Sequence, residues 1–146
     1  KPRNSSDFII TPVMRRNILV TGMLFVAGLL WLLYKFTGDN GEVSATDLSR
    51  FFTIFVMLQF WNMFNAKSYG AGGSAFRGII KSPGFVLVSL LIVVGQVLIV
   101  QFGGEVFRTV PLSISDWVMI IGGTSAVLWV GEIVRMISRV VKKIRK

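Results

Sequence analysis

Four long apolar blocks dominate the sequence and leave few folds open to it. They cover residues 17–36, 48–66, 85–102 and 117–134, and each is close to the roughly 20 residues with which a helix crosses a bilayer. A helix satisfies its own backbone hydrogen bonds in lipid, and no segment shows a useful alternating strand pattern. The sequence therefore predicts an all-α fold, a transmembrane bundle of four helices.

The charged residues sort by side around these blocks. Basic residues gather in the N-terminal flank, in the connection 67–84 and in the tail 135–146, which carries six basic residues and no acid. The acids lie mostly in the other two connections. The positive-inside rule then puts both termini in the cytoplasm. The net charge of +9 follows from this pattern, so we expect membrane lipid as a partner and no nucleic acid.

Several kinds of chemistry are absent from the sequence. The chain has no Cys and no His, which excludes disulfides, thiolate nucleophiles and imidazole bases. The glycine-rich stretch "GAGGSAFRG", residues 70–78, has no strand before it and is interpreted as a link rather than a phosphate-binding loop. We therefore expect no catalytic and no cofactor-binding residue in this part of the polypeptide, which by itself is no enzyme.

Three amides interrupt the block 48–66. Gln59, Asn62 and Asn65 follow one another at intervals of three and form a polar stripe about 120° wide on a helix. Amide oxygens can bind hard cations, and amides also join helices in lipid. We interpret Asn65 as structural, Asn62 as a packing residue or a member of an ion path, and Gln59 as the candidate metal ligand.

Two more polar residues lie inside apolar blocks. Glu132 is the one acid within them, and it is predicted to pair with Arg135 or with Lys residues of other segments, or to line an ion path. Gln96 is isolated and is predicted to hydrogen-bond to a neighbouring helix. Trp117 and Pro83 lie where blocks begin, and Ser44 or Thr46 is expected to cap the second helix.

Longer stretches resemble a known family. The segment "FFTIFVMLQFWNMFNAKSYG", residues 51–70, resembles the eighth transmembrane helix of P-type calcium-pumping ATPases, most of all the plasma-membrane type and its bacterial relatives. The segments "FRGIIKSPGF" and "QVLIVQFGGEVFRTVPLSISDW" are similar to the following connection, ninth helix and outer loop. "MRRNIL" is similar to the approach to the seventh helix.

The resemblance implies the last four of ten membrane helices of a multi-pass pump of the cell membrane. It implies Ca²⁺ as the transported ion and ATP with Mg²⁺ as cofactors of the whole protein. Upstream helices and catalytic domains of the same polypeptide would be the partners, as expected for a chain that does not start with Met. Reticulum-type pumps have Glu where this chain has Gln59, so one Ca²⁺ per cycle is expected.

Two other functions fit the residues. A small stand-alone four-span scaffold or subunit would satisfy its polar stripe inside its own bundle. A lipid- or regulator-binding module would act through the basic tail 135–146, which otherwise serves as a topology anchor along the inner interface.

Overall fold

The protein is helical throughout the part that the structure describes. This computed structural model describes residues 12–38, 41–68 and 74–144, and these form no strand beyond an isolated bridge between Thr37 and Val43. The helices are α1 (Pro12–Phe36), α2 (Ala45–Lys67), α3 (Pro83–Phe102), α4 (Gly104–Phe107), α5 (Ile114–Thr124) and α6 (Ala126–Ile144). Each predicted apolar block is helical, which confirms the all-α prediction.

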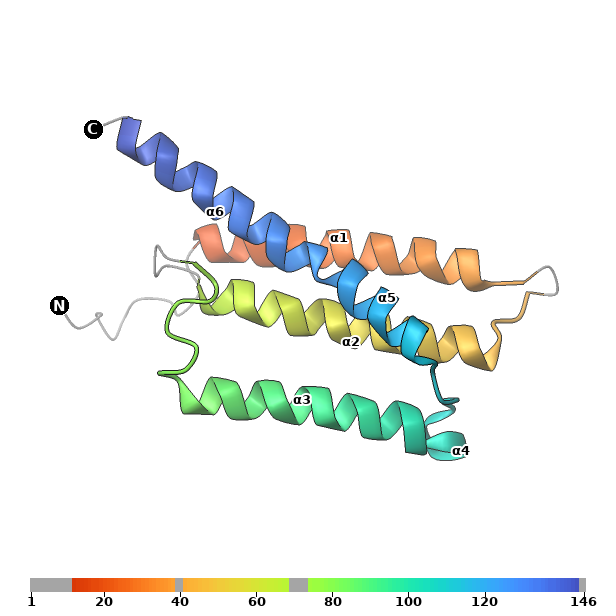
Figure 1. The fold of residues 1–146 in the computed structure, drawn as a ribbon. Coiled ribbons are helices and arrows are strands. Elements are labelled where there is room, and N and C mark those ends of the chain that lie inside the picture. Colours follow the sequence, from red (N-terminus) through yellow and green to blue (C-terminus); the bar gives the residue numbers. More distant parts are fainter. Residues whose placement is uncertain (1–11, 39–40, 69–73, 145–146) are drawn as a thin grey trace.

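Helix α2 lies at the centre of the bundle. It is the described helix that contacts each of α1, α3, α5 and α6, with α1 and α3 on either side and α5 and α6 running obliquely across it (Figure 1). Helix α1 contributes a half-buried stripe at intervals of three and four residues, including Thr21, Phe25 and Leu29. The rest of α1 is exposed, so α1 packs along one edge only.

Two helices begin at the residues that the sequence predicts, whereas α1 begins at Pro12 and α5 at Ile114, several residues before the predicted blocks. The Ser44 hydroxyl accepts a hydrogen bond of 3.1 Å from the Asp47 amide and caps α2, and Pro83 occupies the first turn of α3. Helix α5 begins with a reciprocal capping box between Ser113 and Asp116. Such caps satisfy amide groups that the first turn of a helix leaves without partners.

We expected the fourth block to form one straight helix that ends near residue 134, and this expectation is wrong. It breaks at Ser125 between α5 and α6. The Thr124 hydroxyl donates to the Ile120 carbonyl and the Ser125 hydroxyl to the Gly122 carbonyl, both at 2.6 Å. Hydroxyl bonds of this kind next to glycines bend helices. Helix α6 then continues through most of the basic tail, to Ile144.

Three stretches of described helix are long and apolar enough to cross a membrane. They cover residues 14–36, 83–102 and 114–141. Helix α2 is as long, with 23 residues, but its Gln, Asn, Ser and Thr side chains lower its mean hydropathy. The length and composition of the three stretches are those of the spans of an integral, multi-pass membrane protein.

A buried polar contact joins α2 to α3. The Gln96 side chain, 3% exposed, donates a hydrogen bond of 3.2 Å to the Thr53 hydroxyl, which donates in turn to the Ser49 carbonyl at 2.8 Å. The Ser49 hydroxyl accepts from the Val110 amide at 2.8 Å. This confirms the predicted helix-joining role of Gln96. The bond from Val110 also anchors the connection between α4 and α5 to the same side of α2.

The donor–acceptor order of this contact predicts unequal effects of two isosteric substitutions. Thr53→Val leaves the buried Gln96 amide without an acceptor and should lower the free energy of unfolding by about 1–3 kcal/mol. Gln96→Leu removes the donor itself, and Thr53 keeps its bond to Ser49, so the cost should be about 0.6 kcal/mol. Unfolding in mixed micelles measures both values. Equal costs would contradict this donor–acceptor order.

Candidate functional site

One side of α2 is held against α5 and α6 by polar contacts along most of its length. The Arg50 Nε donates to the Asp116 carboxylate at 2.9 Å. The Trp61 Nε1 donates to the Thr124 hydroxyl at 3.1 Å, and the Asn65 Nδ2 donates to the Val127 carbonyl at 2.9 Å. We call residues 50, 61 and 65 the anchored side. They repeat at helical intervals and therefore point in similar directions.

A different side of α2 is open. Gln59 is exposed and Asn62 is half-buried, and within the described part of the chain neither side chain has a hydrogen-bond partner. Leu48 and Phe55 lie on the same side and are 37% and 43% exposed. The predicted amide stripe is therefore divided, because Asn65 binds α6 while Gln59 and Asn62 remain on this open side.

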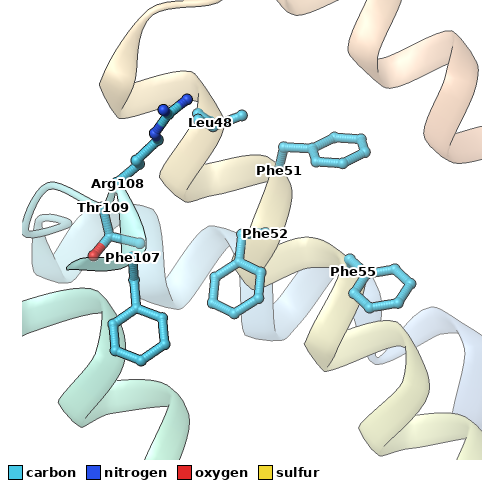
Figure 2. Close-up of a pocket in the computed structure, with 7 residues that line it drawn as sticks. All are labelled: Leu48, Phe51, Phe52, Phe55, Phe107, Arg108 and Thr109. Carbon is cyan, nitrogen blue, oxygen red and sulfur yellow. The ribbon is translucent and has the colours of Figure 1, made fainter. Parts of the chain in front are cut away.

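The open side continues into a groove beside the N-terminal half of α2. The groove has a volume of about 250 Å³. Figure 2 shows side chains from α2 on one wall, and side chains from α4 and the residues after it on the other. The lining residues are Leu48, Phe51, Phe52, Phe55, Phe107, Arg108 and Thr109. This apolar lining, with a single charged residue, offers packing surface and no set of cation ligands.

Glu132 lies at the opposite end of the bundle, in a cluster that joins three segments. Its carboxylate accepts hydrogen bonds from the Arg135 Nη2 at 2.8 Å, from the Arg139 Nη2 at 3.3 Å and from the Ala75 amide at 3.0 Å. The Arg135 Nη2 also donates to the Asn65 Oδ1 at 3.0 Å. The predicted pairing of Glu132 with Arg135 is confirmed.

The sequence did not predict two of these contacts. Ala75 belongs to the connection that we interpreted as a flexible link, yet it is 1% exposed and bound to Glu132. Gly131 leaves room for Asn65, since a Cβ atom at residue 131 would lie 2.3 Å from the Asn65 Oδ1. A buried alanine and a helical glycine carry no motif that would have indicated either contact.

The described residues contain no group of three or more His, Cys, Asp or Glu side chains able to hold a metal ion. Gln59 therefore supplies at most one neutral oxygen to a cation, which needs several oxygen ligands. The bundle provides a rigid helix with two amides on an open side, and further ligands would have to come from other segments.

The fold and this surface define an integral membrane domain with one side of α2 left open. The family model described as "Cation transporting ATPase, C-terminus" matches residues 1–137. The chain belongs to this family, and it forms a C-terminal transmembrane region of the P-type ATPase kind, in agreement with the resemblance in the sequence.

Individual relatives agree with the family. The chain is 35% identical to the human (Homo sapiens) "Calcium-transporting ATPase type 2C member 1" over 149 positions, which cover 99% of this chain and 16% of the relative. It is 30% identical to the human "Plasma membrane calcium-transporting ATPase 1" and 29% identical to "Plasma membrane calcium-transporting ATPase mca-1" of Caenorhabditis elegans. These two alignments each cover 94% of this chain and 12% of the relative.

Proposed function

We propose that this chain, residues 1–146, forms the last four membrane spans of an ATP-driven Ca²⁺ pump, and that Gln59 borders the path of the ion. The open side of α2 carries this proposal, because Gln59 and Asn62 are the amides of α2 that bind nothing within the described bundle. Unpaired amides facing hydrocarbon are costly and usually face a partner or a cavity. Relatives named as calcium-transporting ATPases support Ca²⁺ as the transported ion.

The remaining ligands would come from helices of the same polypeptide. Ca²⁺ takes six to eight oxygen ligands, and Gln59 offers one. The human type 2C relative is about six times as long as this chain, which covers 16% of it. Helices in that additional sequence would cover the open side of α2 and bring carboxylates next to Gln59, and Asn62 would lie about one turn away.

Glu132 serves helix packing rather than the ion path in this proposal. Its carboxylate is already bound by two arginines and a backbone amide, which leaves little capacity for a cation. The residues of this chain do not fit Mg²⁺ or ATP, because the described part holds no acidic cluster and the sequence has no phosphate-binding loop. Both would bind in the catalytic domains of the whole protein.

We further propose that α2 is a fourth span, that both termini lie in the cytoplasm and that the protein resides in the cell membrane. Helix α2 lies alongside α3 and has the same range of length (Figure 1). Its polar groups on the anchored side are bound by α5 and α6, which lowers the cost of placing them in lipid. The basic connection 74–82 and the basic end of α6 then share one side of the membrane.

Single cysteines test this topology in a full-length pump from which cysteines outside residues 1–146 have been removed, since these residues contain none. Thr46→Cys places an exposed thiol at the beginning of α2, and Arg77→Cys places one in the connection that follows its end. In intact cells an impermeant maleimide should label residue 46, and it should label residue 77 only after permeabilisation. Labelling of both residues from the same side would show that α2 does not cross the membrane.

Replacement of Gln59 tests the ion path in the full-length pump. Gln59→Leu removes one neutral ligand oxygen and should raise the Ca²⁺ concentration for half-maximal transport about tenfold, which corresponds to roughly 1.4 kcal/mol of binding free energy. The maximal rate at saturating Ca²⁺ should change much less. Uptake of radioactive Ca²⁺ into inverted membrane vesicles measures both quantities.

The matched control is Gln96→Leu, the same chemical change at a buried amide that binds Thr53. It should leave the Ca²⁺ dependence of transport unchanged. If Gln59→Leu behaves like this control, Gln59 does not border the ion path.

A further inference from the structure

A cluster at the inner end of the bundle joins α2, α6 and the connection between α2 and α3. We call Asn65, Glu132 and Arg135 the clasp. The Asn65 side chain both donates to the Val127 carbonyl at 2.9 Å and accepts from the Arg135 Nη2 at 3.0 Å. The same Nη2 binds Glu132, which also holds the Ala75 amide. Three segments thus meet through side chains of three residues.

The surface of α6 is shaped for the amide of Asn65. A Cβ atom at Gly131 would lie 2.3, 2.7 and 2.8 Å from the Oδ1, Cγ and Nδ2 atoms of Asn65, so a larger residue there would expel the side chain. Gly122 and Gly123, in the preceding helix α5, have no atom within 4 Å of such a Cβ. The close approach is therefore specific to the clasp and is not a general property of glycines in this block.

The Arg135 guanidinium has few hydrogen-bond acceptors besides those in the clasp. The Nε atom of Arg135 is buried and has no hydrogen-bond partner within the described residues. Loss of Asn65 would remove a further partner from the same guanidinium, and unsatisfied charged donors are costly. Asn65 therefore helps to hold the Arg135 guanidinium, which also binds Glu132 on the same helix.

Asn65 and Gln59 belong to one rigid helix. Six residues separate them, which corresponds to about 120° of rotation and about 9 Å along the axis. Trp61 lies between them in the sequence and donates to Thr124. This second contact on the anchored side holds α2 in the same rotation about its axis. The rotation of α2 that places Asn65 against Gly131 is the rotation that keeps Gln59 on the open side.

We propose that the clasp positions Gln59, with Asn65 as the positioning residue and Gly131 as the space that admits it. This inference rests on the proposed role of Gln59 in the ion path. Asn65 itself binds no ion, because both polar atoms of its amide are already used within the bundle. It acts on the ion only through the orientation of α2.

A double-mutant cycle in the full-length pump tests the proposal. Asn65→Ala and Gly131→Ala should each raise the Ca²⁺ concentration for half-maximal transport about threefold to tenfold, because each removes the same contact. Gly131→Ala should add little in the Asn65→Ala background, since the side chain that it displaces is already gone. Gly122→Ala, which meets no atom, is the matched control and should leave the Ca²⁺ dependence near that of the wild type.

Two outcomes would overturn the positioning role. One is a loss of expression or maximal rate with an unchanged Ca²⁺ dependence, which indicates a merely structural contact. The other is full additivity of the two substitutions, which shows that Gly131 does not act through Asn65. The same cycle, measured as free energy of unfolding, tests the contact between them without any transport.

The cycle also separates this inference from the proposed function. If Asn65 acts through Gln59, Asn65→Ala should hardly raise the Ca²⁺ concentration for half-maximal transport any further in a Gln59→Leu protein. Suppose that Gln59→Leu leaves the Ca²⁺ concentration for half-maximal transport unchanged while Asn65→Ala raises it. The proposed role of Gln59 then fails, and the clasp acts on another part of the pump.

Discussion

The arrangement of this bundle depends on the hydrogen bonds that hold one side of α2 against α5 and α6. Arg50, Trp61 and Asn65 each bind a partner on that helix pair, and they are spread over most of the length of α2. Without apolar exclusion from water to drive helices together in lipid, such contacts and close packing determine how membrane helices associate. Once this side is fixed, every other side of α2 is fixed as well.

The break at Ser125 is part of the same constraint. The Thr124 hydroxyl accepts from Trp61 and donates to the Ile120 carbonyl, so the residue that ends α5 is also a point of contact with α2. Helix α5 then meets α2 at Arg50, and helix α6 meets it at Asn65. A single straight helix crossing obliquely would contact α2 over a shorter distance.

The sequence predicted the elements well because their signals are local. Apolar length indicated the helices, Ser44 and Pro83 indicated two of their starts, and the position of Glu132 next to Arg135 indicated an ion pair. The division of the amide stripe could not be predicted from helical intervals, since these show which residues share a side but not which neighbour faces it. The contact of Asn65 with Gly131, like that of Ala75 with Glu132, depends on segments brought together only by the fold.

The proposed function depends on the neutral oxygen of Gln59, which α2 presents on its open side. A carboxylate at Gln59 would add charge and favour a further divalent cation, whereas an amide does not. The most direct test of this account counts the Ca²⁺ ions transported per ATP hydrolysed by the full-length protein in sealed vesicles. We expect a ratio of one, and a ratio of two would contradict the proposed role of Gln59.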